Sequence, residues 1–363
     1  MASSGIELAV ISDPKNVYYF TGYVNNGATQ VPTYLLVFED QEPSLVTGVT
    51  EEPNVVRSYG GNVETYPNYD LNRRMVAHPN LAIHEIERIV ARSSRKPRTV
   101  GIEFWTCAEG IHRALEGTLD RPEFVDISET VLGMRARKNP DEIEAIAKGF
   151  ELIDLLFKTM QENAVAGRSE LECYATAYHE LIVRNGATSF QFLFGDFVSG
   201  ERSLLRGGPP TTRVLRNGDT FIIDVWLTAQ NYWADGSRTL FVGRKPSPDQ
   251  RRVMTVLKTA LAAGAENLKP GNKAAVVYRA IFEVIEKAGL AKYFPHHGGH
   301  GVGLDAWEPP FIIPGSKEEL KEGMVCTLEP GVYLPEVGGL RIEDGFLITP
   351  NAAKCLCKFP FDN

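Results

Sequence analysis

The residues best suited to chemistry are histidines in a glycine-rich segment and carboxylates inside apolar strands. Three of the seven histidines, His296, His297 and His300, lie within Pro295–Leu304. Glycines at this density indicate that the backbone approaches something small, since glycine alone tolerates such an approach and a positive φ freely. The segment is therefore a candidate binding site.

Asp224 and Asp235 are isolated acids in two consecutive apolar strand patterns. A buried carboxylate is costly unless it is paired or bound to a metal. If the strands form a hairpin centred on Ala229-Gln230, the two aspartates lie directly opposite each other, with both side chains on one face. Ala-Gln is a poor turn dipeptide, so this register rests on the spacing rather than on the turn type.

A second pair of acids shows the same pattern. Glu329 follows the apolar run Met324–Leu328, and Glu343 stands in the next predicted strand. Pairing them centres a hairpin on Glu336, and Gly338-Gly339 would accommodate the odd-length loop through a bulge. Four clustered carboxylates raise one another's pKa values, whereas two divalent metal ions would remove the repulsion and position a bridging hydroxide as nucleophile. The simpler alternative is a set of buried, salt-bridged acids.

Alternating helices and strands must position these residues. Beyond residue 134, helix-start signals occur at Asn139-Pro140, Ser169–Glu172 and Ser247–Gln250, and a further helix closes at Gly289. Two helices followed by strands, repeated once, predict an α+β domain. The predicted strands are Thr220–Trp226, Tyr232–Val242, Met324–Leu334 and Gly339–Ile348.

Strand patterns and helical patterns alternate in the first third of the chain, which predicts an α/β domain with a central sheet. Its strand patterns are Ile6–Ser12, Tyr34–Phe38, Pro43–Thr47 and Thr99–Phe104, and its helical patterns are Leu71–Arg95 and Cys107–Glu116. The charged stretch Gly133–Pro140 is the expected boundary, which gives domains of residues 1–133 and 134–363.

Composition excludes several classes of protein. The 363 residues carry a formal charge of −8, and 43% are hydrophobic, as in an ordinary soluble protein of about two domains. Without clustered Lys and Arg we expect no nucleic-acid partner, and the acidic balance gives no reason to expect a membrane partner. No apolar run approaches the ~18 residues of a membrane span, and no signal peptide is visible. We therefore expect a cytoplasmic protein.

Five motifs, in order and spacing, resemble metallopeptidase family M24, which includes prolidase and Xaa-Pro aminopeptidase. They are Asp224, Asp235–Thr239, Gly299–Gly303, Glu329–Gly331 and Arg341–Asp344. The segment Ser12–Gly22 resembles the family's creatinase-like N-terminal domain. The resemblance implies an α+β pita-bread C-terminal domain preceded by a smaller α/β creatinase-like N-terminal domain.

The resemblance also implies a pair of divalent metal ions. Asp224 and Asp235 would bind one ion, and His300 and Glu329 the other, while Asp235 and Glu343 would bridge both. Glu329 would also carry a proton to the leaving nitrogen. We expect manganese, with cobalt or zinc as alternatives, because carboxylate-rich sites accept all three.

Other positions are predicted to contact substrate or to support the catalytic groups. His296 matches the family's histidine beside the substrate, whereas His297 has no counterpart. Arg341 is expected to assist catalysis by bracing Glu343 or Asp344. The sequence departs from the family in having Trp307 where a second histidine is usual, and in lacking a histidine near Arg206 and Gly207. Trp307 and Arg206 are therefore the candidate substrate-binding donors.

The expected function is a dinuclear-metal hydrolase that cleaves the amide bond before proline in dipeptides or short peptides. The resemblance also implies a homodimer. The absent histidines keep open an enzyme acting on a non-peptide small molecule, either a creatinase-like or ectoine-hydrolase-like C–N hydrolase or a lyase. A non-catalytic peptide-binding module is a third possibility, against which the retained ligands argue. Turnover and metal content discriminate among the three.

Overall fold

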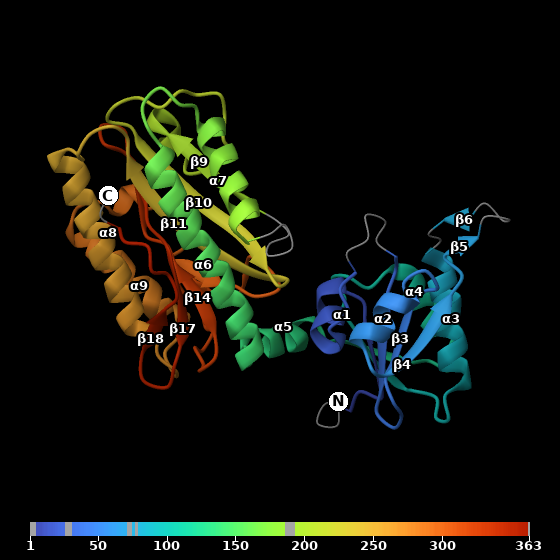
Figure 1. Cartoon of the computed structure of the whole chain (residues 1–363). Helices are drawn as coiled ribbons and strands as arrows, with labels where there is room; N and C mark the ends of the chain where they lie inside the picture. Colours follow the sequence, from blue (N-terminus) through green and yellow to red (C-terminus); the bar gives the residue numbers. More distant parts are fainter. Residues whose placement is uncertain (1–4, 26–30, 71–74, 77–78, 186–192, 362–363) are drawn as a thin grey trace. The chain divides into compact units, whose positions relative to one another are not determined.

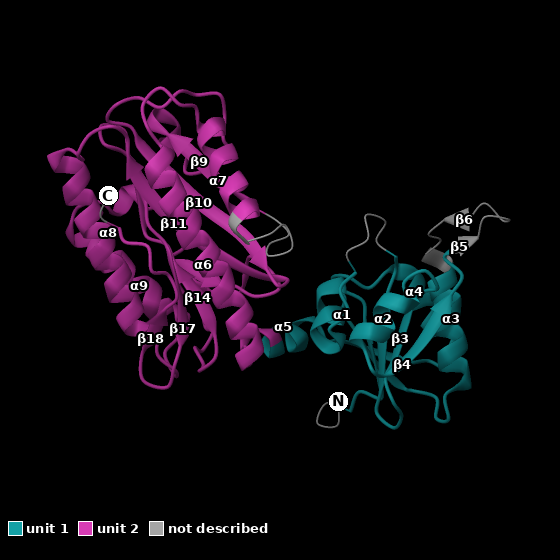
Figure 2. Ribbon diagram, viewed as in Figure 1, with its two compact units in different colours: residues 1–134 teal, residues 135–363 magenta. Residues whose placement is uncertain are grey.

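A computed structural model describes the chain except residues 1–4, 26–30, 71–74, 77–78, 186–192 and 362–363 (Figure 1). The chain divides into two compact units, Met1–Met134 and Arg135–Asn363 (Figure 2). Among the described residues, no helix is both long enough and apolar enough to cross a membrane.

The first unit is built around a six-stranded mixed sheet with strand order β4-β3-β2-β1-β7-β8. Successive residues of the central strand β1 pack into different hydrophobic cores, because side chains along a strand point alternately to the two faces of the sheet. Leu8 and Val10 pack with the α3 residue Ile86, whereas Ala9 packs with Val17 of α1. Helices therefore cover both faces of the sheet, which confirms the predicted α/β domain.

The helix predicted over Leu71–Arg95 is too long, because α3 begins only at Pro79 and the short strand β6 precedes it. Residues 71–74 and 77–78 of that prediction lie outside the described residues. The elements of this unit are β1 (Leu8–Ile11), α1 (Pro14–Thr21), β2 (Tyr34–Phe38), β3 (Ser44–Gly48), α2 (Glu52–Ser58), β4 (Asn62–Tyr66), β5 (Tyr69–Asp70), β6 (Met75–Val76), α3 (Pro79–Arg92), β7 (Thr99–Ile102), α4 (Glu109–Thr118), β8 (Glu123–Asp126) and α5 (Ser128–Ala136), whose last two residues belong to the second unit.

Reciprocal capping boxes start three helices of the second unit where the sequence predicts them. Asn139 and Ser247 cap α6 and α8, and Ser169 forms the same pair of hydrogen bonds with Glu172 before α7. The elements are α6 (Pro140–Asn163), α7 (Glu170–Asn185), β9 (Leu193–Ser199), η2 (Gly200–Leu205), β10 (Thr220–Ala229), β11 (Tyr232–Phe241), α8 (Pro248–Asn267), α9 (Ala274–Lys287), η3 (Ala291–Tyr293), β12 (Gly299–Gly301), β13 (Glu308–Ile312), β14 (Val325–Leu328), β15 (Gly331–Leu334), β16 (Gly338–Arg341), β17 (Asp344–Ile348) and β18 (Ala353–Cys355).

The strands of this unit form a three-stranded sheet, β11-β10-β9, a five-stranded sheet, β13-β12-β14-β17-β18, and the hairpin β15-β16. Helix α6 lies across β10 and β11, and α8 and α9 pack beside each other (Figure 1). Leu257 of α8 and Ile281 of α9 share a core with Leu328 of β14. This packing holds the strands that carry the candidate ligands.

The β10–β11 hairpin differs in register from the prediction. Its turn is Gln230-Asn231, both with positive φ, so Asp224 lies opposite Ser237 and Asp235 lies opposite Trp226. The predicted direct pairing of the two aspartates is therefore wrong by two residues. Because side chains alternate with a period of two, this shift leaves both aspartates on the same face.

The Glu329 and Glu343 hairpin has the predicted register on both sides of the acids. Leu328 pairs with Asp344 and Gly331 with Arg341, about a turn centred on Glu336. Each predicted continuous strand is nevertheless broken at its acid. The backbone N–H of Glu329 donates to the carbonyl of Gly298 at 2.9 Å, and that of Glu343 donates to Ser237 at 2.9 Å. Both acids thereby join strands from elsewhere in the unit.

Two buried cations, Arg135 and Lys138, bind Glu308 at the start of β13. Glu308 accepts from Arg135 Nη2 at 2.7 Å and from Lys138 Nζ at 2.6 Å, and all three side chains are buried. The substitution Glu308→Gln should lower the free energy of unfolding of the second unit by about 3–5 kcal/mol, because buried Lys138 and Arg135 each lose a carboxylate partner, although Arg135 keeps Asp305 at 2.6 Å. Denaturant unfolding measures the loss. The exposed acid Glu322→Gln is the control, and a loss below about 1 kcal/mol would contradict the prediction.

Candidate metal centre

A pocket of about 350 Å³ gathers the chemically interesting residues of the second unit. Its volume falls within the range of small-molecule sites. All nine residues singled out from the sequence line it: Asp224, Asp235, His300, Glu329, Glu343, His296, Arg341, Arg206 and Trp307. The lining also contains Asp196, Leu205, Gly207, Trp226 and His297.

Three of the carboxylates are almost fully buried, with exposures of 3% for Asp224 and 1% for both Asp235 and Glu343. Burial raises the pKa of Asp224 to about 7, although Arg341 offsets part of the effect. Burial and the neighbouring acids raise the pKa values of Asp235 and Glu343 well above the usual range. The cluster is therefore unfavourable unless protons or cations neutralise it.

The unsatisfied atoms in this cluster fit metal ions. Asp224 Oδ1, Asp235 Oδ1 and Glu343 Oε1 are buried without a hydrogen-bond partner among the described residues. A buried acceptor left unpaired is costly, and bound divalent cations would satisfy such oxygens. Ligand atoms of Asp235, His300 and Glu343 lie within 4.8 Å of one another. Carboxylate and imidazole donors together suit manganese, cobalt or zinc.

His300 is oriented to present a lone pair to this cluster. Its Nδ1 lies 3.0 Å from the carbonyl of Gly301, which only accepts, so Nδ1 carries the proton in the neutral ring. The unprotonated Nε2 lies 3.5 Å from Asp235 Oδ2 and 3.6 Å from Glu329 Oε1. A hydrogen bond of this kind from the second ring nitrogen fixes the tautomer of metal-binding histidines.

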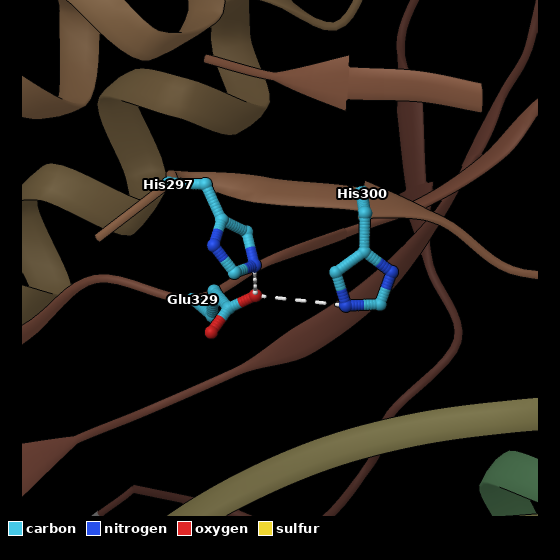
Figure 3. Close-up of side chains that lie close together, drawn as sticks. All are labelled: His297, His300 and Glu329. Carbon is cyan, nitrogen blue, oxygen red and sulfur yellow. Dashed lines mark ion pairs between the residues drawn. The ribbon is translucent and has the colours of Figure 1, made fainter. Parts of the chain in front are cut away.

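Glu329 differs from the other acids because histidines surround it. Burial raises its pKa, but the contact with His297 and electrostatic attraction to the His297 and His300 rings outweigh burial and lower the pKa to about 2. Glu329 Oε1 lies 2.8 Å from His297 Nε2 (Figure 3). The carboxylate is therefore ionised at neutral pH.

Arg341 pairs with different acids from those expected. Its Nη2 lies 2.5 Å from Asp224 Oδ2 and 2.8 Å from Asp196 Oδ2, whereas Asp344 pairs with Arg238 at 2.7 Å. Asp196 was missed in the sequence although it lies directly opposite Asp224 in the β9–β10 ladder. The signal used for Asp224, a lone acid among apolar strand residues, would also have found Asp196.

The remaining predicted residues form the wall of the pocket. His296 Nδ1 donates to the carbonyl of His297 at 2.9 Å, so its Nε2 accepts from the Tyr333 hydroxyl at 3.1 Å. Burial lowers the pKa of His296 to about 4, which keeps the ring neutral. Trp307 is 57% exposed, and its ring centroid lies 5.1 Å from that of His297. The Arg206 carbonyl accepts from Arg341 at 2.9 Å, while its side chain is exposed.

Residues 144–350 match the model of metallopeptidase family M24, and residues 1–137 match the creatinase/prolidase N-terminal domain. The chain belongs to metallopeptidase family M24. An Xaa-Pro dipeptidase of Pyrococcus furiosus is similar to this M24 protein at 31% identity, over 99% of this chain and 95% of the relative.

Solved structures agree with the family. The prolidase from Pyrococcus furiosus matches this M24 chain with a TM-score of 0.84 and 32% identity, over 99% of this chain and 98% of that one. An Xaa-Pro dipeptidase from Bacillus anthracis matches with a TM-score of 0.85 and 25% identity, over 99% and 95%. These matches confirm the resemblance and the expected fold, a creatinase N-terminal domain followed by an M24 pita-bread domain.

Proposed function

We propose that this M24 metallopeptidase is a dinuclear-metal hydrolase that cleaves the amide bond before proline in dipeptides or short peptides. The observation that carries the proposal is the set of three unsatisfied carboxylate oxygens beside His300 and Glu329 in one pocket. The full-length similarity to an Xaa-Pro dipeptidase supports the substrate class.

The proposed ligands divide between two ions. Asp224 and Asp235 would hold one ion and His300 and Glu329 the other, with Asp235 and Glu343 shared. Bound divalent ions would supply Lewis acidity, polarising the substrate carbonyl and making water a better nucleophile. We propose manganese for the carboxylate-rich positions, with cobalt and zinc as alternatives.

The protein's own side chains would orient the reaction and move its proton. Glu329, ionised and facing the pocket, would accept a proton from water and pass it to the leaving nitrogen. Arg341 is a positioning residue, since it contacts Asp224 and offsets part of the burial cost of that charge. His296 is held at both ring nitrogens, so it would shape the wall beside the substrate.

Arg206 would recognise the carboxylate of a dipeptide. Among the described lining residues it is the exposed cation, whereas Arg341 is buried against two aspartates. The substitution Arg206→Ala should raise KM for Leu-Pro by about 10–100-fold, because a charge-assisted hydrogen bond contributes roughly 1.5–3 kcal/mol. The KM for C-terminally amidated Leu-Pro should be the same with and without Arg206, because the amide carries no charge. The exposed Arg216→Ala is the control, and equal KM values for wild type and Arg206→Ala would contradict this role.

Turnover of a small peptide panel tests the proposed function. Wild-type protein is assayed on Ala-Pro, Leu-Pro, Leu-Ala and a tripeptide with proline second, both metal-stripped and loaded with manganese. We expect metal-dependent cleavage of the proline-containing substrates and little cleavage of Leu-Ala. No cleavage with two ions bound would favour the non-peptide alternative, and no bound metal would favour the binding module. The homodimer stays a prediction, which sedimentation velocity would test.

A further inference from the structure

His297 brings a third imidazole to the candidate metal centre. It lies between η3 and β12, three residues before His300, and both rings face the carboxylate of Glu329 (Figure 3). The family resemblance gives this histidine no counterpart and therefore no role.

His296 and His297 differ in the hydrogen bonds that their ring nitrogens make. Both ring nitrogens of His296 are engaged, Nδ1 with a carbonyl and Nε2 with Tyr333. In contrast, His297 Nε2 is buried and lacks a hydrogen bond of good geometry among the described residues, although it lies 2.8 Å from Glu329 Oε1. His296 is thus committed to the protein wall, whereas His297 presents a nitrogen to the pocket.

The spacing of the ligand atoms suits a shared ion. Two nitrogen or oxygen atoms bound at about 2.0–2.1 Å to one metal lie roughly 3–3.5 Å apart. The distances from Glu329 Oε1, 2.8 Å to His297 Nε2 and 3.6 Å to His300 Nε2, bracket that range. Ligand atoms of these three residues all lie within 4.8 Å of one another.

We propose that His297 is a further metal ligand, which joins His300 and Glu329 on one ion. This inference rests on the proposed metal centre but not on the peptide substrate. The ion would be bound by two imidazoles, whereas the position held by Asp224 and Asp235 remains carboxylate-rich. Since imidazole favours zinc or cobalt and carboxylate favours manganese, the two positions would differ in metal preference.

Metal binding tests the proposal without an activity assay. Zinc and manganese affinities are measured by competition with a chromogenic chelator for wild type, His297→Ala and His297→Gln. The glutamine retains a donor toward Glu329, so it separates loss of a ligand from loss of the Glu329 contact. His179→Ala is the matched control, because that histidine is exposed.

We expect both His297 variants to weaken zinc binding by at least about 10–100-fold, the loss usual when even an outer-shell partner is removed. Manganese affinity should change less, and X-ray absorption of protein with one equivalent of zinc should show one imidazole fewer. Unchanged zinc affinity and an unchanged imidazole count in folded His297→Gln would overturn the proposal while leaving the dinuclear centre intact. A wild type that binds no divalent ion would overturn both.

Discussion

The substitution Glu329→Gln is expected to lower kcat on Leu-Pro by on the order of 10²–10⁴, the range contributed by a positioned general base. Glutamine has nearly the same shape but neither accepts a proton nor carries the charge that His297 and His300 face. The loss should fall on kcat more than on KM, because proton transfer is required only in the transition state.

A matched control lies in the same hairpin. Glu336 is an exposed acid at the tip of the β15–β16 loop, so Glu336→Gln should leave kcat unchanged. Metal content is measured alongside, because Glu329 is also a proposed ligand. If the Glu329→Gln protein holds both ions and keeps the wild-type kcat, Glu329 takes no part in proton transfer.

Removing divalent metal is expected to abolish turnover and to destabilise the second unit. Bound ions would neutralise Asp235 and Glu343, whose pKa values burial and mutual repulsion raise well above their usual range. A ligand at 100 times its Kd stabilises the folded state by about 2.7 kcal/mol. For a unit of this size, each ion should then raise Tm by roughly 5–10 °C. Calorimetry of metal-stripped protein titrated with manganese measures the shift.

The substitution Asp235→Asn tests whether manganese raises the Tm by relieving the repulsion among the buried carboxylates. Asp235 is buried beside Glu343 and Asp224, so removing its charge should raise the Tm of the metal-free protein. The same change removes a proposed bridging ligand, so manganese should no longer raise the Tm. If manganese stabilises Asp235→Asn as much as wild type, the ions bind elsewhere.

Sequence alone determined the chemical class and most of the pocket lining. Isolated acids in apolar runs identify Asp224, Asp235, Glu329 and Glu343, since a charge is not buried among apolar residues without a counterpart. Helix caps such as Asn139 and Ser247 are local signals, because the capping hydrogen bonds span only three residues. Local alternation also predicts which face of a strand an acid occupies, even where the register is wrong by two.

Only the tertiary structure decided which distant side chains meet. The left-handed turn at Gln230-Asn231 sets the register of Asp235, and the β9–β10 ladder brings Asp196 beside Asp224 and Arg341. The packing of β12 beside β14 brings His297 to Glu329. These contacts depend on how strands far apart in sequence align and on how sheets pack. A single chain's local pattern does not encode that alignment, because each strand is compatible with several partners.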